Sequence, residues 1–66
     1  MKLRNRVREM RQSRRMNQKT LAEKAGTAQQ TISDIETGRR VPSIITALML
    51  ARALGKSVET LFFLED

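Results

Sequence analysis

The sequence predicts an all-α fold, a single compact domain of five short helices that spans the whole chain of 66 residues. Two observations carry this prediction. Apolar residues recur three and four positions apart along most of the chain, which is the spacing of one helix face. Residues that begin helices, such as Asn17 and Ser43, and glycines that end them, such as Gly26 and Gly55, divide the chain into short segments. No segment shows a strand signal.

Three helices are expected in the N-terminal half. The first covers residues 3–15, where apolar residues share one face and neither Pro nor Gly interrupts. The second covers residues 18–25 and ends at Gly26. Thr27 is expected to cap the third helix, which runs to about Thr37. The inner faces of the three are expected to carry Leu3, Val7, Met10, Leu21, Ala22, Ala25, Ile32 and Ile35.

Two further helices are expected in the C-terminal half. Ser43 caps a fourth helix, Ile44 to Leu54, and Gly55 closes it. Ser57 starts a short fifth helix, Val58 to about Phe63. The residues of the fourth helix expected in the core are Leu48, Ala51 and Leu54.

The composition excludes several classes of function. Cysteine and histidine are absent, which removes disulfides, the usual zinc ligand sets, thiol nucleophiles and the imidazole general base. No phosphate-cradling glycine loop accompanies the Ser, Thr and carboxylate residues. No apolar run approaches the roughly 20 residues that span a bilayer, and no signal core follows the basic N-terminus. We therefore expect a soluble, cytoplasmic, nucleoid-associated protein that is not an enzyme and has no cofactor, no metal ion and no membrane partner.

The charge distribution favours a polyanionic partner. The net charge is +6, and nine of the thirteen cations are Arg, whose forked guanidinium matches phosphate oxygens. Residues 1–24 hold nine basic and two acidic groups, whereas residues 41–66 hold two basic and three acidic groups. A merely solubilising surface would give the same composition, so charge alone does not decide the function.

The most informative segment is residues 18–37, QKTLAEKAGTAQQTISDIET. It is typical of two short helices joined by a tight glycine turn, with a small residue where the helices cross. Ala22 is that small residue, and Gly26 allows the sharp turn at positive φ. Leu21, Ala25, Ile32 and Ile35 would then close a common core.

A family resemblance rests on this segment and on the residues C-terminal to it. The order L-A-x-x-x-G-T-x-Q-Q-T-I-S-x-I-E-x-G-R-R-x-P, with L-A-R-A-L-G after it, resembles the Cro and phage-repressor type (XRE-like) helix-turn-helix family over nearly the whole chain. The resemblance implies a five-helix, lambda-repressor-like fold in which the third helix enters the major groove of double-stranded DNA. It also implies that symmetric dimers read two half-sites.

Four residues of the third helix are expected to read bases. Gln29, Gln30, Ser33 and Asp34 project away from its apolar face, and glutamine can pair with adenine N6 and N7. The alternative is that the glutamines only solvate an exposed helix. Three roles stay open for Asp34: selecting cytosine, rejecting other sequences, or pointing sideways to solvent. Ala28 replaces the Ser or Thr common in the family, which removes a hydroxyl that could contact phosphate.

A second set of residues is expected to contact phosphates and fix the docking register. Its members flank the two motif helices, and they are Arg11, Arg15, Asn17, Gln18, Thr37, Arg39 and Arg40. Either Arg39 or Arg40 alone would be compatible with an ordinary charged loop, but the pair beside this helix favours phosphate contact. Arg11 is also expected to pair with Glu36 between the first and third helices, as similar proteins often do.

The C-terminal part suggests a dimer interface. Ile45 and Met49 form an apolar stripe on the fourth helix at positions that are often polar in similar domains. Phe62, Phe63 and Leu64 lie in the segment that closes against this helix, and one phenylalanine is expected to complete the core. The other is expected to anchor a homodimer. In the alternative, both phenylalanines pack inside.

The resulting expectation is a sequence-specific regulator of transcription, a repressor rather than an activator, that binds an inverted repeat as a homodimer. One alternative is an antitoxin-like or phage-control module in which Ile45, Met49 and Phe63 contact another protein and DNA binding is secondary. Another is a non-specific nucleic-acid binder that uses only its basic first helix. The two glutamines argue against the latter.

Overall fold

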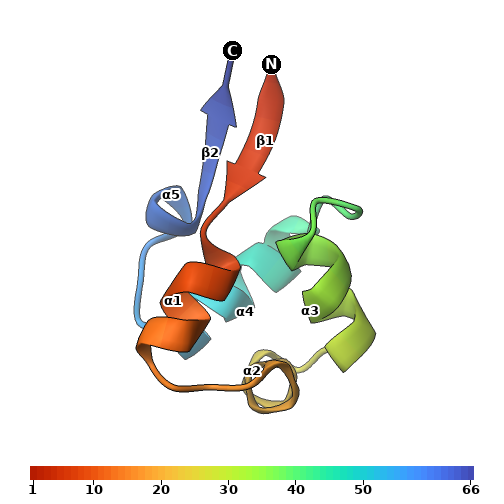
Figure 1. Ribbon diagram of the computed structural model, residues 1–66, viewed down its shortest axis with the longest axis vertical. Helices are drawn as coiled ribbons and strands as arrows, with labels where there is room; N and C mark the ends of the chain where they lie inside the picture. Colours follow the sequence, from red (N-terminus) through yellow and green to blue (C-terminus); the bar gives the residue numbers. More distant parts are fainter.

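The computed structural model describes all 66 residues and contains five helices and a two-stranded ribbon. The helices form the body of the molecule, and the ribbon projects from it with both chain ends at its tip (Figure 1). In chain order the elements are β1 (Lys2–Asn5), α1 (Val7–Ser13), α2 (Gln18–Ala25), α3 (Gln29–Glu36), α4 (Ile44–Leu54), α5 (Val58–Leu61) and β2 (Phe62–Glu65). No helix has both the length and the apolarity that a membrane crossing requires.

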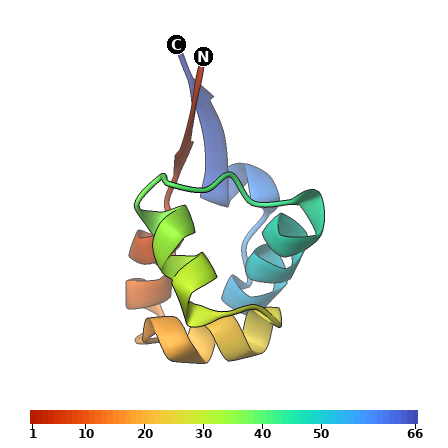
Figure 2. The same ribbon diagram turned by 90° about the vertical axis from the view of Figure 1, so that its right-hand side faces the viewer.

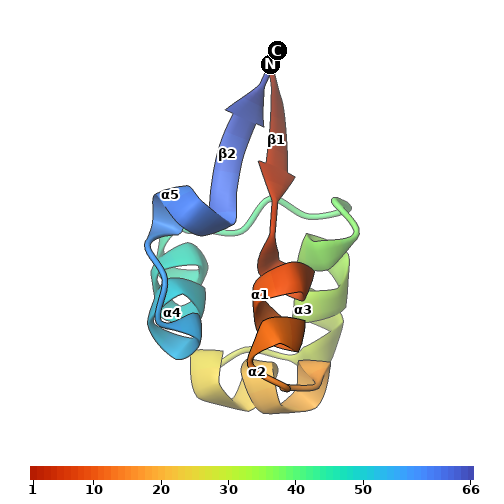
Figure 3. The same cartoon turned by 60° about the vertical axis from the view of Figure 1, so that its left-hand side comes forward.

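The hydrophobic core lies between the five helices. α2 packs against both α3 and α4, while α1 contacts the same two helices from the other side (Figure 3). Most of the apolar residues expected on the inner helix faces are buried there. The buried cluster consists of Val7, Leu21, Ala22, Ala25, Ile32, Ile35, Leu50, Ala51, Leu54 and Leu61.

The two strands correct the expectation of a purely helical chain. β1 and β2 pair antiparallel, with Leu3 opposite Leu64 and Asn5 opposite Phe62. A strand of four residues is stabilised by its partner, and the partner of β1 lies at the other end of the chain. The helical spacing of Leu3 and Val7 is therefore coincidental. Of the residues 3–15 that were expected to form one helix, only Val7–Ser13 are helical. The fifth helix likewise ends at Leu61, because the next residues belong to β2.

The start of α1 has a local cause that involves Asn5. Its Oδ1 accepts a hydrogen bond from the Val7 N–H at 3.1 Å, and its Nδ2 donates to the Ile35 carbonyl at 3.0 Å. One side chain thus satisfies the first turn of α1 and the last turn of α3. The ribbon is attached to the helical body at this point.

The cap expected for the third helix is wrong by one residue. Ala28 occupies the N-cap of α3 and has no side-chain cap hydrogen bond. Thr27 instead donates its N–H to the Ala22 carbonyl at 3.0 Å and completes the end of α2, where Gly26 adopts a φ of 68°. The expected caps Asn17, Ser43 and Ser57 all accept a hydrogen bond from a backbone N–H in the first turn of their helix.

The orientation of α4 differs from the expectation. Its buried residues are Ala47, Leu50, Ala51 and Leu54, which follow the spacing of one helix face. Leu48, expected in the core, is 51% exposed. The helix is apolar on several sides, so hydrophobicity alone did not identify the inward side.

Substitution of two leucines of α4 tests this orientation. Leu50→Ala is expected to lower the free energy of unfolding by about 2 to 5 kcal/mol, because it leaves a cavity in a core with no exposed surface at that position. Leu48→Ala removes the same atoms from a side chain that is half-exposed in the single chain. At a protein concentration where the chain is monomeric, it is expected to cost well under about 1 kcal/mol. Urea unfolding of both variants measures these two changes. Equal losses in the free energy of unfolding would contradict the orientation of α4.

Candidate nucleic-acid interface

The two helices of the motif meet at a tight turn. Gly26 takes the left-handed conformation there, and Ala22 is 4% exposed at the crossing of α2 and α3. Figure 2 shows α2 along the base of the molecule and α3 rising above it. Because Ile32 and Ile35 are buried, the opposite side of α3 faces solvent.

The four candidate base-reading residues lie on this outer side. Gln29 and Gln30 are exposed in the first turn of α3, while Ser33 and Asp34 are partly exposed one turn later. Gln30 Nε2 donates to Asp34 Oδ1 at 3.0 Å. The structure therefore presents two amides, one hydroxyl and one carboxylate on one helix face.

The far end of α3 is anchored by a buried carboxylate. The Glu36 side chain has no exposed surface, and Arg11 Nε donates to its Oε2 at 2.7 Å. Arg8 Nε, at 3.3 Å, and Gln18 Nε2, at 3.1 Å, donate to its Oε1. Glu36 thus joins α3 to both α1 and α2.

Two opposed effects act on the pKa of Glu36. Burial alone would raise it, because a carboxylate loses its hydration. The hydrogen bonds from Arg11, Gln18 and Arg8, together with the charge of Arg11, outweigh burial and hold the pKa of Glu36 below its ordinary value. The carboxylate is therefore ionised at neutral pH.

Arg11 has little capacity left for a phosphate. It is 9% exposed, and Nε and Nη2 both donate to Glu36. Its Nη1 donates to the Met16 carbonyl at 2.8 Å. The arginine that was expected to serve both roles is oriented toward the interior.

The other candidate phosphate contacts lie around the motif. Asn17 Oδ1 accepts from the Thr20 N–H at 2.8 Å, which leaves the N–H groups of Gln18 and Lys19 without a partner in the helix. Thr37 Oγ1 donates to the Ser33 carbonyl at 3.0 Å. The side chains of Arg15, Arg39 and Arg40 are exposed and make no ion pair.

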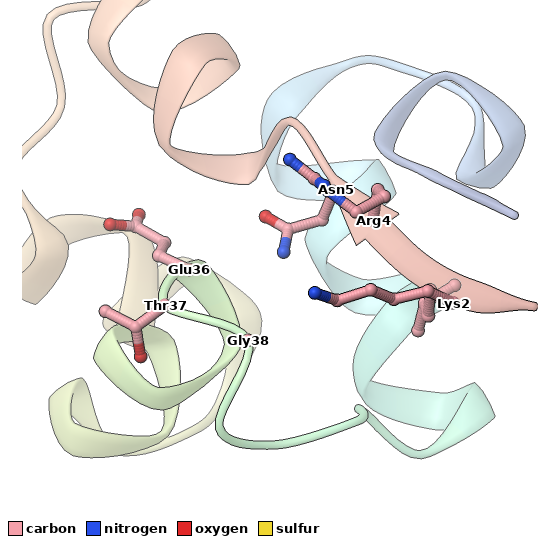
Figure 4. A pocket seen from close by; sticks show the side chains of 7 residues that line it. Lys2, Arg4, Asn5, Glu36, Thr37 and Gly38 are labelled. Carbon is pink, nitrogen blue, oxygen red and sulfur yellow. The ribbon is translucent and has the colours of Figure 1, made fainter. Parts of the chain in front are cut away.

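A polar cleft of about 330 Å³ separates β1 from the end of α3. Its lining residues are Lys2, Leu3, Arg4, Asn5, Glu36, Thr37 and Gly38. Figure 4 shows Lys2 extended toward Gly38, with Asn5 directed at the end of α3. No cluster of three or more carboxylates is present that could hold a metal ion.

The candidate dimer residues fall into two groups. Ile45 is 71% exposed and Leu64 is 63% exposed. Met49 and Phe62 are partly buried and pack against the core, and Phe63 lies under the Arg6 guanidinium at 4.5 Å from the ring centre. The exposed apolar residues that sequence reasoning did not include are Val41, Ile44 and Leu48.

Three hydrogen-bonded contacts were not predicted from the sequence. They are the bonds from Arg8 and Gln18 to Glu36 and the bond from Arg14 Nη1 to the Leu54 carbonyl at 2.8 Å, which caps α4. A Cβ at Gly55 would lie 2.7 Å from Nη1 of this guanidinium, which would have to move, and the φ of 64° itself favours glycine there. No local sequence signal marks these contacts, since each joins separate elements.

Comparison with known proteins identifies the family. The family model described as Helix-turn-helix matches residues 7–61. The chain belongs to this XRE-type helix-turn-helix family. The resemblance seen in the sequence is thereby confirmed, and members of this family bind double-stranded DNA.

Relatives of this helix-turn-helix protein occur in archaea and bacteria. An uncharacterized HTH-type transcriptional regulator of Methanothermobacter thermautotrophicus is 42% identical, over 97% of this chain and 94% of its own length. The Bacillus subtilis regulator YgzD is 36% identical, over 97% of both chains. The restriction-modification controller protein C.AhdI from Aeromonas hydrophila is 33% identical over 83% of both chains, with a TM-score of 0.80. A Bacteroides fragilis structure, 23% identical, covers 92% of this chain and 98% of its own and shares the fold with a TM-score of 0.82.

Replacement of Glu36 tests the anchor. Glu36→Gln is expected to lower the free energy of unfolding at pH 7 by about 3 kcal/mol, because Arg11 keeps a buried charge without its counter-charge. The stabilisation by ionised Glu36 is present above its ordinary pKa of 4.5 and is lost as pH falls through the lowered folded pKa. The difference between the two proteins should therefore shrink in acid.

Urea unfolding between pH 3 and pH 7 measures this difference. Glu23→Gln is the control, because Glu23 is exposed on α2 and makes no ion pair. The stability of Glu23→Gln should stay close to that of the parent protein from pH 3 to pH 7. A Glu36→Gln deficit that does not change with pH would contradict the role assigned to the carboxylate.

Proposed function

We propose that this helix-turn-helix protein is a transcriptional regulator that binds double-stranded DNA in a sequence-specific manner. The observation that carries the proposal is the outer side of α3, where Gln29 and Gln30 are exposed in the first turn. Recognition helices read bases from their first turns, and glutamine is suited to adenine. The similarity to HTH-type transcriptional regulators and to a controller protein supports the same function.

Phosphate contacts on both sides of α3 would set the register. The unpartnered N–H groups of Gln18 and Lys19 at the start of α2 can receive one phosphate. Arg39 and Arg40 follow α3 and can reach the opposite strand. The Thr37 hydroxyl beside them would have to leave the Ser33 carbonyl to donate to a phosphate. Arg15 adds a cation before α2. These contacts supply affinity, and the outer side of α3 supplies specificity.

A second copy of the chain would complete the binding unit. No charged residue lies between Arg40 and Arg52, and Val41, Ile44, Ile45 and Leu48 in this stretch are all more than half exposed. Each copy carries a net charge of +6, so two copies repel each other unless they meet at an uncharged surface. This apolar face begins beside the loop that follows α3, and a twofold axis there presents two copies of α3 to an inverted repeat.

A repressor is the favoured type of regulator. A domain of 66 residues can occlude a promoter, but it offers little surface for the recruitment of polymerase. The proposed DNA target supports a location in the cytoplasm, at the nucleoid.

Selection of duplexes from a random pool tests the specificity. At near-physiological salt the protein is expected to enrich an inverted repeat with half-site centres about one helical turn apart. The double variant Gln29→Ala, Gln30→Ala should lose the preference for A·T over other base pairs at these positions of each half-site. The expected loss in preference is roughly tenfold or more. If no duplex is enriched and the affinity simply decreases as the salt concentration rises, the proposal of sequence-specific binding is wrong.

A charge placed on the apolar face tests the dimer. Ile45→Lys is expected to convert a dimer into a monomer in sedimentation velocity, because it buries an ammonium group in the interface. Glu59→Lys places an even larger increase in positive charge at an exposed position of α5, outside the apolar face, and should leave the dimer intact. A parent protein that is monomeric, both alone and on its duplex, would instead favour a module whose apolar face receives a different protein.

A further inference from the structure

Asp34 has a single side-chain interaction, and it is with a candidate base-reading residue. Gln30 Nε2 donates to its Oδ1 at 3.0 Å, one helical turn away on the outer side of α3. Asp34 takes part in none of the three ion pairs of the molecule. The carboxylate therefore acts on the Gln30 amide.

The hydrogen bond removes an ambiguity that every free glutamine has. Rotation of an amide by 180° exchanges its NH₂ donor and its carbonyl acceptor. An acceptor on the next turn of the helix holds the NH₂ group on that side. One N–H is then bonded to Asp34, while the second N–H and Oε1 stay free. A donor beside an acceptor is what adenine N7 and N6 require.

We propose that Asp34 is a positioning residue that holds the Gln30 amide in the orientation that reads adenine and disfavours guanine. Guanine offers two acceptors, N7 and O6, and pairs with an amide that turns both N–H groups toward the base. That orientation breaks the hydrogen bond from Nε2 to Asp34 and leaves the carboxylate without its partner. The inference rests on the proposed function, because it specifies how α3 chooses its base.

This role differs from direct reading by Asp34. A carboxylate that accepted from cytosine N4 would act on its own base pair, independently of Gln30. A carboxylate that only repelled phosphates would lower the affinity for all duplexes alike. Positioning predicts an effect confined to the base pair that Gln30 reads and absent when Gln30 is absent.

Binding of matched duplexes separates these roles. The base pair read by Gln30 is the one whose preference is lost in Gln30→Ala, and adenine and guanine versions of it are compared by titration. The parent protein is expected to prefer adenine by about tenfold or more, and Asp34→Ala should reduce this preference at least about fivefold. Asp34→Asn should restore the preference, because its Oδ1 accepts the same hydrogen bond.

Two double variants supply the control. In the Gln30→Ala background, Asp34→Ala should leave the remaining preference unchanged. In the Gln29→Ala background it should have its full effect, because the residue one turn beyond Gln29 is Ser33 and not Asp34. In the free protein, Asp34→Ala should shift the Gln30 side-chain amide resonances in an NMR spectrum and leave those of Gln29 in place.

The outcomes distinguish this inference from the proposed function. Suppose that an operator is enriched and that Asp34→Ala keeps the preference for adenine at the base pair read by Gln30. This result overturns the inference about Asp34 and leaves the proposed function intact. So does a loss in Asp34→Ala that is equally large without Gln30, or that falls on a different base pair. Absence of any enriched duplex overturns the proposed function and the inference with it.

Discussion

The Glu36 carboxylate receives hydrogen bonds from Arg8 and Arg11 of α1 and from Gln18 of α2, and it has no exposed surface. Three helices are thereby fixed relative to one another at one point. A helix of eight residues such as α3 has few contacts with which to hold its angle. The isoleucines Ile32 and Ile35 fix one side of it, and Glu36 fixes its end. Alternative orientations of α3 would leave a charge buried without a partner, so they are strongly disfavoured.

Several arginines of this strongly basic chain interact with other parts of the fold. Arg4 pairs with Glu65, and Arg6 lies over Phe63. Arg8 and Arg11 bond Glu36, and Arg14 caps α4. The arginines of the N-terminal segment therefore act mainly within the fold. The exposed cations around α2 and α3 that make no ion pair are Arg15, Lys19, Lys24, Arg39 and Arg40. Net charge is consistent with a polyanionic partner, but it overstates how many cations face that partner.

The sequence predicted those parts of the fold that depend on local chemistry. The caps Asn17, Ser43 and Ser57 and the turn at Gly26 could be predicted because each acts within a few residues of its own position. The ribbon could not, because β1 is stabilised by a strand at the other end of the chain. The inward side of α4 could not be predicted either. Leu48 and Leu50 are chemically identical, and only packing determines that Leu50 is buried and Leu48 is exposed. The outer side of α3 followed from its apolar spacing, whereas the bonds of Gln18 and Gln30 to carboxylates needed side-chain geometry.

The two carboxylates of α3 illustrate how burial decides what a charge does. Glu36 is enclosed, and its hydrogen bonds to cations and an amide make it a structural anchor. Asp34, two residues earlier, is partly exposed and has an amide as its only side-chain partner. A rigid anchor and an oriented amide complement each other. The angle of α3 fixes where the Gln30 side chain can reach, and a neighbouring acceptor fixes which of its atoms faces a base. Under the proposed function, specificity in so small a domain depends on two hydrogen-bonded acids that do not themselves need to touch DNA.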